Sequence, residues 1–195
     1  ILRELGKEKK IEFTSSPKYH AILPFLGEQE IIRQIKINDE TNRFFLGEAY
    51  APKGFFPPEM AYDEKIAPII ADLGFEWIIL DEIACGGDIE KVDYTKIYKV
   101  QGINLKVFFR ERRLSNLIMS AVVRSQESLL EAMKEDFPPK ADPPLAEKSS
   151  RYLVTAMDGE TFGHHRPGLV EMLFYVLAAP YFKLICVSDL SLYYH

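Results

Sequence analysis

The stretch "GFFPPEMAYDEKIAPIIADLGFEWIILDE", residues Gly54–Glu82, determines the expected fold. It starts inside Pro52–Glu59, a short strand that its prolines limit in length. Tyr62–Gly74 follows as a helix, with Gly74 as its C-terminal cap. Phe75–Glu82 is a continuous apolar run of the kind found in buried parallel strands. A strand, a helix and a second strand in this order predict a parallel sheet with helices outside it.

The rest of the chain continues the same alternation. Further strands are predicted at Lys10–Ser16, Leu105–Glu111, Arg151–Asp158 and Phe182–Ser191. Further helices are predicted at Gly27–Glu40, Leu114–Phe137 (divided near Arg124–Ser125) and Arg166–Ala179. Pro138–Ser150, rich in proline and polar residues, is predicted to be a loop. The fold class is therefore α/β with parallel strands.

The length suits one domain, residues 1–195. A complete (β/α) barrel usually takes about 250 residues, so we expect this chain to supply only part of one. It opens without a methionine and stops directly after a strand-like run, which favours a fragment of a larger domain, truncated at both ends.

Composition excludes several classes of function. The net charge of −5 gives no electrostatic basis for binding nucleic acid or an anionic membrane. No apolar run approaches the roughly 20 residues that span a bilayer, and the charged start lacks the apolar segment of a signal peptide. Only two cysteines occur, far apart, which favours a reducing compartment. We therefore expect a cytoplasmic protein.

Acidic residues gather where the predicted strands end. They are at Pro58–Glu59, Asp81–Glu82, Asp158–Glu160 and Ser188–Asp189. In parallel α/β folds, catalytic residues lie on the loops that follow the carboxyl ends of the strands. Paired carboxylates at such a site suit glycoside chemistry, in which one acts as nucleophile or base and the other as acid. The plainer alternative is that each acid is exposed at a strand end and caps the next helix.

Glu59 and Asp158 are the two carboxylates best suited to catalysis. The two prolines before Glu59 restrict the backbone and hold its side chain in a set direction. The apolar "YLVTAM" before Asp158 predicts a desolvated carboxyl with a raised pKa, as a general acid needs.

Two segments closely resemble signature regions of glycoside hydrolase family 57: Gly54–Glu82, quoted above, and "TAMDGETFGHHRPG", Thr155–Gly168. Two weaker similarities accompany them. "TSSPKYHAILPFL" (Thr14–Leu26) has Ala21 where the family usually has proline. "VFFRERRLSNLI" (Val107–Ile118) has Glu111 and Asn116 where aspartates are common. The family's N-terminal His-Gln-Pro motif has no counterpart in the chain.

The resemblance implies an enzyme of α-glucans such as starch, glycogen or maltodextrin, of the α-amylase or 4-α-glucanotransferase type. It implies an incomplete (β/α)7 TIM-like barrel and a retaining double displacement without cofactor or metal. Glu59 falls on the family's nucleophile and Asp158 on its general acid/base. Retention requires the two carboxyl groups to lie roughly 5–5.5 Å apart.

Further residues are predicted to bind substrate, each with a plainer alternative. By resemblance His20 lies in a substrate subsite; otherwise it is a polar residue before a helix. Glu160 is predicted to tune Asp158 from a neighbouring position. His164 and His165 are predicted to contact sugar hydroxyls, or else to form a cap or surface pair.

Aromatic and charged residues near the predicted acids have two possible roles. Phe55, Phe56 and Tyr62 flank Glu59 and are predicted to stack on sugar, whereas Trp77 is predicted to be core. Glu82, with Asp81, and Asp189 are predicted to line the site. Arg110, Arg112 and Arg113 either pair with these acids or form a solvated cluster.

Two other functions compete with this one. A metal-dependent polysaccharide deacetylase needs two histidines separated by three or four other residues, together with an aspartate. His20, His164, His165 and His195 do not have that spacing, which argues against a metal site. The other alternative is a degenerate barrel that binds glucan without catalysis or only assembles with partners. The presence of both Glu59 and Asp158 argues against it, whereas truncation argues for it.

Overall fold

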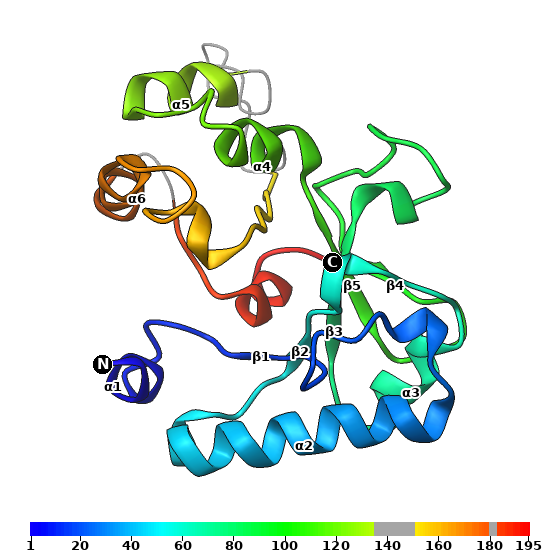
Figure 1. Cartoon of the computed structure of the whole chain (residues 1–195). Coiled ribbons are helices and arrows are strands. Elements are labelled where there is room, and N and C mark those ends of the chain that lie inside the picture. Colours follow the sequence, from blue (N-terminus) through cyan, green and yellow to red (C-terminus); the bar gives the residue numbers. More distant parts are fainter. Residues whose placement is uncertain (135–150, 180–182) are drawn as a thin grey trace. The chain divides into compact units, whose positions relative to one another are not determined.

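The computed structural model describes residues 1–134, 151–179 and 183–195, which fall into two compact units (Figure 1). The first unit consists of residues 1–91, 96–109 and 186–195, and the second of residues from 92–95 and 110–185. The predicted loop Pro138–Ser150 lies outside the described residues. No helix in the described ranges is both long and apolar enough to cross a membrane.

The first unit is built on a five-stranded sheet with the order β1-β2-β3-β5-β4. Its strands are β1 (Thr14–Ser15), β2 (Gly54–Phe55), β3 (Trp77–Asp81), β4 (Tyr98–Lys99) and β5 (Lys106–Arg110). β1 and β3 each pair with β2 in parallel, as predicted. β4 pairs with β5 in an antiparallel direction and was not predicted, because two residues carry too little alternation to be recognised.

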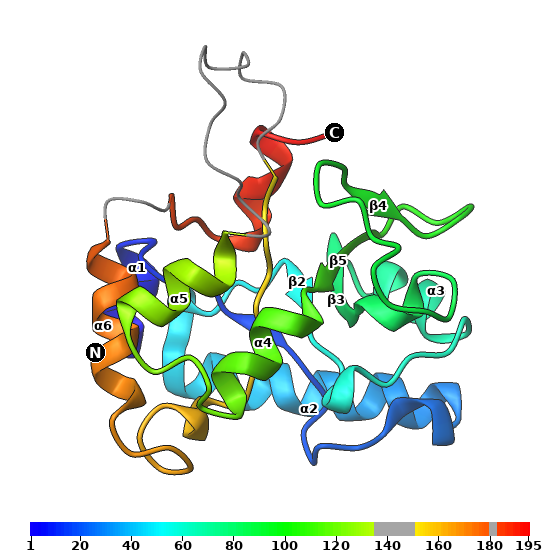
Figure 2. The ribbon, with the colours of Figure 1, turned by 90° about the horizontal axis from the view of Figure 1, so that it is seen from above.

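Helices join the parallel strands in the predicted order. α2 (Glu28–Leu46) connects β1 to β2, and α3 (Ile66–Asp72) connects β2 to β3. Figures 1 and 2 show α2 running along the β1 and β2 side of this unit. α2 extends further than its predicted end at Glu40, whereas Gly74 follows α3 with a φ of 92°, as expected of a helix-terminating glycine. A short helix not predicted from the sequence, α1 (Leu2–Lys7), precedes β1.

Trp77 lies at the centre of this unit's core. Its side chain is 2% exposed, packs edge-on against Phe108 and donates a hydrogen bond from Nε1 to Ser188 Oγ at 2.9 Å. The indole covers Gly54 on the neighbouring strand so closely that a Cβ there would meet ring atoms at 2.1 Å. The prediction that Trp77 is core is confirmed, and Gly54 is the residue that makes room for it.

The second unit contains three α-helices in its described part. They are α4 (Arg112–Met119), α5 (Gln126–Met133) and α6 (Leu169–Ala178). The predicted division near Arg124–Ser125 is confirmed, because the Ser125 side chain accepts a hydrogen bond from Ser128 N–H and caps α5. Apolar side chains of all three helices form one core, with Leu114, Leu129 and Met172 among its members.

Two predicted strands differ from the structure. Arg151–Asp158 makes only one bridge, a parallel one between Val154 and Arg110. The described part of Phe182–Ser191 contains no strand, and Val187–Leu192 is a 3-10 helix in the first unit. Ser188 does not take part in strand pairing, because its N–H donates to the Glu12 carboxylate and not to a neighbouring strand.

Candidate active site

In the first unit, the candidate site lies just beyond the carboxyl ends of β1 and β2. Phe56 N–H donates to Ser15 O at 2.9 Å, which continues the β1–β2 pairing past the end of β2. Pro57 and Pro58 are buried, and the next residue is Glu59. The chain therefore leaves the sheet at the two prolines, and Glu59 lies on the turn that follows them.

That turn holds Glu59 in an unusual backbone conformation. It is a 3-10 turn, Pro58–Met60, in which Met60 N–H donates to Pro57 O at 2.9 Å. Glu59 and Met60 have φ values of 57° and 51°, in the left-handed region that residues with a Cβ rarely adopt. Such residues cost of order 1–3 kcal/mol each and cluster at functional sites.

His20 lies against the Glu59 carboxylate. Its Nε2 is 3.0 Å from Glu59 Oε1, and both side chains are about 70% exposed, 70% and 71% respectively. His20 also has a left-handed φ, 53°. Two residues that follow neighbouring strands are thus joined side chain to side chain. The sequence predicted both residues for the site but not their contact.

The aromatic residues near Glu59 divide into exposed and core positions. Phe55 is completely buried and packs on Phe75, so its prediction as a sugar-stacking residue is wrong. Phe56 and Tyr62 are half-buried. Burial raises the pKa of the Tyr62 phenol, and the nearby carboxylates of Glu64 and Asp63 raise it further.

Asp81, the last residue of β3, has a structural role. Asp81 accepts a hydrogen bond from Ile83 N–H at 3.1 Å and caps the turn Glu82–Ala84, as in the plainer reading of strand-end acids. Glu82 is buried, with 6% of its surface exposed. Asp189 is exposed, and it lies on the 3-10 helix that replaces the predicted last strand.

Asp158 belongs to the second unit. It precedes the turn Gly159–Thr161, and its carbonyl accepts a hydrogen bond from Thr161 N–H at 3.0 Å. The Asp158 side chain is exposed, so the apolar residues before it do not bury its carboxyl as predicted. Those residues turn instead toward their own unit, where Tyr152 and Val154 are buried. The predicted separation of Glu59 and Asp158 stays a prediction, since the two residues belong to different units.

Glu160, His164 and His165, which follow Asp158, are all exposed. Glu160 O accepts a hydrogen bond from His165 N–H at 2.8 Å, and the rings of His164 and His165 lie 5.2 Å apart. They form a short polar segment next to Asp158. Within residues 1–134, 151–179 and 183–195, no three His, Cys, Asp or Glu side chains come together as a group that could hold a metal ion.

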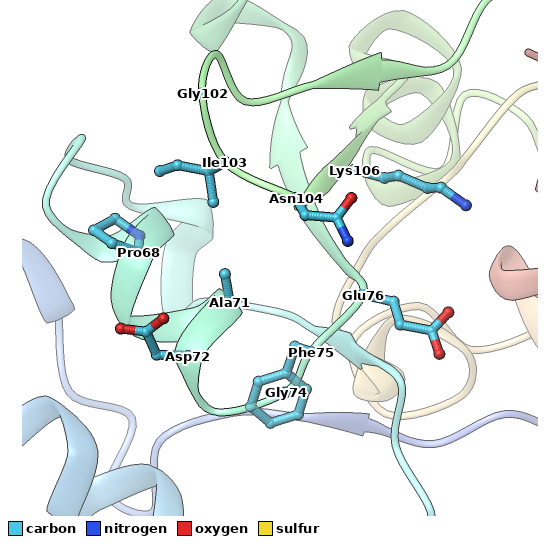
Figure 3. A pocket seen from close by; sticks show the side chains of 10 residues that line it. All are labelled: Pro68, Ala71, Asp72, Gly74, Phe75, Glu76, Gly102, Ile103, Asn104 and Lys106. Carbon is cyan, nitrogen blue, oxygen red and sulfur yellow. The ribbon is translucent and has the colours of Figure 1, made fainter.

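A separate hollow lies at the other ends of the strands (Figure 3). Its walls come from α3 and from the residues that enter β3 and β5, among them Asp72, Glu76 and Lys106. Glu76 forms an ion pair with Lys53, and Lys106 donates to Ser191 Oγ at 2.7 Å. Because Glu59 follows the carboxyl end of its strand and this hollow adjoins the amino ends, the hollow is not part of the candidate site.

Arg110, for which the sequence left two roles open, ends β5, and Ser115, to which the sequence assigned no role, lies in α4. Arg110 is 4% exposed, and its Nε donates to Ala156 O at 2.8 Å, two residues before Asp158. Ser115 Oγ accepts from Ala156 N–H at 3.3 Å. The signal that could have identified them is the segment Val107–Ile118, one of the weaker similarities to the family.

Comparison with known proteins identifies the family and the fold. Residues 1–179 match glycosyl hydrolase family 57. Alpha-amylase 1 of Dictyoglomus thermophilum is 25% identical over 166 residues, which cover 83% of this chain and 22% of that protein. The alpha-amylase of Niallia circulans is 27% identical over 82 residues, 40% of this chain and 6% of that protein. The chain thus spans about a quarter or less of the curated relatives it matches.

Solved structures share the fold. The 4-alpha-glucanotransferase of Thermococcus litoralis superposes with a TM-score of 0.75 at 20% identity, covering all of this chain and 30% of that one. A family 57 branching enzyme of Thermococcus kodakaraensis, solved with glucose, gives a TM-score of 0.67 at 20% identity over 100% of this chain and 49% of that one. The α/β fold with its mostly parallel sheet therefore matches part of the (β/α)7 barrel, and the chain belongs to glycosyl hydrolase family 57.

Proposed function

We propose that the protein containing this chain is a retaining glycoside hydrolase or transglycosylase of α-glucans, with Glu59 as nucleophile and Asp158 as general acid/base. The family membership supports the class of reaction. The observation that carries the assignment of Glu59 is its carboxylate, presented on a left-handed turn beyond β2 and hydrogen-bonded to His20 at 3.0 Å.

In the proposed first step, a Glu59 carboxylate oxygen attacks the anomeric carbon. The bond from that carbon to the glycosidic oxygen breaks as the Asp158 carboxyl gives its proton to the departing oxygen. A covalent glycosyl ester on Glu59 and a free sugar hydroxyl result.

In the second step, the Asp158 carboxylate removes a proton from water or from a sugar hydroxyl. The deprotonated oxygen bonds to the anomeric carbon and releases Glu59. Water as acceptor gives hydrolysis, and a sugar hydroxyl gives transglycosylation. Two inversions at the same carbon leave its α configuration unchanged.

His20 is proposed to orient one carboxylate oxygen of Glu59 and to lie in the substrate subsite. Phe56 and Tyr62 are proposed to contact the sugar rings, and Glu82, Glu160, His164, His165 and Asp189 to line the rest of the site. Cys85 and Cys186 are both free thiols, which supports the proposal of a cytoplasmic protein.

The test measures reducing sugar and transfer products released from maltooligosaccharides by the full-length protein. Glu59→Gln and Asp158→Asn are each expected to lower kcat/KM by at least about 10²-fold. Glu64→Gln, which changes an exposed acid near the same turn, is the matched control and is expected to retain activity. Full activity in both Glu59→Gln and Asp158→Asn would refute the assignment.

Azide then distinguishes the two roles. In Glu59→Gly, azide can enter from the face that the nucleophile occupied and should yield a β-glycosyl azide from an activated substrate. In Asp158→Gly, azide intercepts the covalent ester and should yield an α-glycosyl azide. The opposite pattern of products would exchange the two assignments.

A further inference from the structure

Arg110 is a buried cation at the carboxyl end of β5. A buried guanidinium is costly unless acceptors surround it, so its partners reveal what it holds in place. Nε donates to Ala156 O at 2.8 Å, and Nη2 donates to Asn116 Oδ1 at 2.8 Å and lies 3.3 Å from Met119 Sδ. One side chain therefore links the end of β5, helix α4 and the segment that leads to Asp158.

The backbone of the same segment is bound to β5 as well. Glu111 N–H donates to Val154 O at 2.8 Å, next to the parallel bridge between Arg110 and Val154. Both polar backbone groups of Ala156 are engaged, its carbonyl by Arg110 and its N–H by Ser115 Oγ. Figures 1 and 2 both show this segment, in yellow, passing beside α4. The chain is thus held at two successive points just before Asp158.

Helix α4 is itself fixed to the end of β5. The buried Glu111 carboxylate accepts hydrogen bonds from the N–H groups of Arg113, at 3.2 Å, and Leu114, at 2.6 Å, and so caps α4. Ser115 Oγ donates to Glu111 O at 2.6 Å while it accepts from Ala156. The segment Glu111–Asn116 is therefore a rigid support that presents Ser115 and Asn116 in set positions.

Asp158, by contrast, has an exposed side chain. The position of Asp158 therefore depends on the chain before and after it. Before it, Ala156 is held by hydrogen bonds. After it, Thr161 is buried and its N–H donates to Asp158 O. We propose that Arg110 and Ser115 are positioning residues that hold Ala156 and thereby set the place of the Asp158 carboxyl. This inference rests on the proposed role of Asp158 as general acid/base.

A displaced general acid has a distinctive kinetic effect. Proton donation matters most for a leaving group that departs as a poorly stabilised alkoxide, and little for a fluoride ion. Maltotetraose and α-maltotriosyl fluoride can both transfer a maltotriosyl group to Glu59, and they differ in the leaving group. The ratio of kcat/KM for the fluoride to kcat/KM for maltotetraose therefore reports on the acid. It does not depend on how much of the protein is folded.

The experiment measures this ratio in the full-length protein. Arg110→Met is expected to raise it at least about tenfold, since a shift of 1 Å in a catalytic group can cost 10²-fold. Ser115→Ala removes a single hydroxyl and is expected to raise the ratio by a smaller factor, about threefold or more. Arg113→Met is the matched control, because Arg113 also donates to a backbone carbonyl, that of Ala132, but on α5. Its ratio should equal that of the wild type.

Asp158→Asn provides the reference for a lost acid. A large rise in the ratio for Asp158→Asn, with ratios within twofold of wild type for Arg110→Met and Ser115→Ala, would overturn this inference and leave the proposed function standing. An unchanged ratio in Asp158→Asn would overturn the proposed function itself. If Arg110→Met yields no folded protein, Ser115→Ala alone decides.

Discussion

Gly54 is the position where one methyl group should disturb the sheet most. In Gly54→Ala, the new Cβ would meet three atoms of the Trp77 ring at 2.1–2.2 Å. Carbon atoms pack at about 3.5–4.0 Å, so the ring or the strand must move by roughly 1.5 Å. Trp77 cannot yield easily, because it is 2% exposed, packs against Phe108 and donates to Ser188.

The loss of stability expected for Gly54→Ala has two parts. Overpacking a core typically costs about 1–3 kcal/mol, and the loss of the Trp77–Ser188 hydrogen bond adds about 1 kcal/mol. We therefore expect Gly54→Ala to lower the free energy of unfolding by about 3 kcal/mol. For a chain of this size, that corresponds to a Tm lower by about 6–12 °C. Differential scanning calorimetry of the purified protein measures both.

Two further variants make the result decisive. Gly159→Ala adds a methyl group where no atom lies within 4 Å and should change Tm little. In a Trp77→Leu background, which removes the ring, Gly54→Ala should cost much less than in the wild type. Equal costs of Gly54→Ala in both backgrounds would refute the reasoning, because the clash with Trp77 would then not be its source.

Two more predictions concern the backbone of the candidate site and the pH dependence of stability. Because φ of Glu59 is 57°, the Glu59→Gly variant should be more stable than Glu59→Ala by about 1 kcal/mol in thermal unfolding. Both variants lack the proposed nucleophile, so they differ only in backbone preference and one methyl group. Equal stability of the two would contradict a left-handed turn. Burial raises the pKa of Tyr50 to about 12, and its hydroxyl donates to Asp39 at 2.9 Å. The native state therefore keeps this proton while the unfolded state loses it above about pH 10, so stability should fall between pH 10 and 12 by up to about 2–3 kcal/mol. Urea unfolding should show this fall in the wild type and a smaller one in Tyr50→Phe.

Much of the architecture was predictable because it depends on local patterns. The apolar run Phe75–Glu82 became β3, and the division near Arg124–Ser125 followed from a serine that caps the next helix. The final strand predicted at Phe182–Ser191 was wrong, because its described part contains no strand. Its apolar residues resemble a strand, but a distant carboxylate, Glu12, binds the N–H of Ser188. Local sequence carries no information about such a partner.

In the candidate site, too, some features were predictable from the sequence and others were not. Glu59, Asp158 and His20 were identified from residue type, position after predicted strands and family resemblance. Phe55 was assigned to the wrong environment, because strand direction alone does not tell which face meets the core. Arg110 had two open readings, pairing with acids or solvation. The structure buries it and turns its Nε to a backbone carbonyl.

The sequence by itself therefore determined the α/β class and the order of the main helices and parallel strands, since these depend on residue type and short-range periodicity. It also identified the acids proposed for catalysis, from residue type, their position after predicted strands and the resemblance to the family. Only the tertiary structure decided that His20 reaches Glu59, that Gly54 must lack a side chain beside Trp77, and that Arg110 and Ser115 hold Ala156. In each of these contacts the two partners are roughly 20 to 50 positions apart in the sequence. Separations of this order are those that sheet pairing creates. No short segment of the sequence contains both partners of any of these contacts, so only the folded chain brings them together.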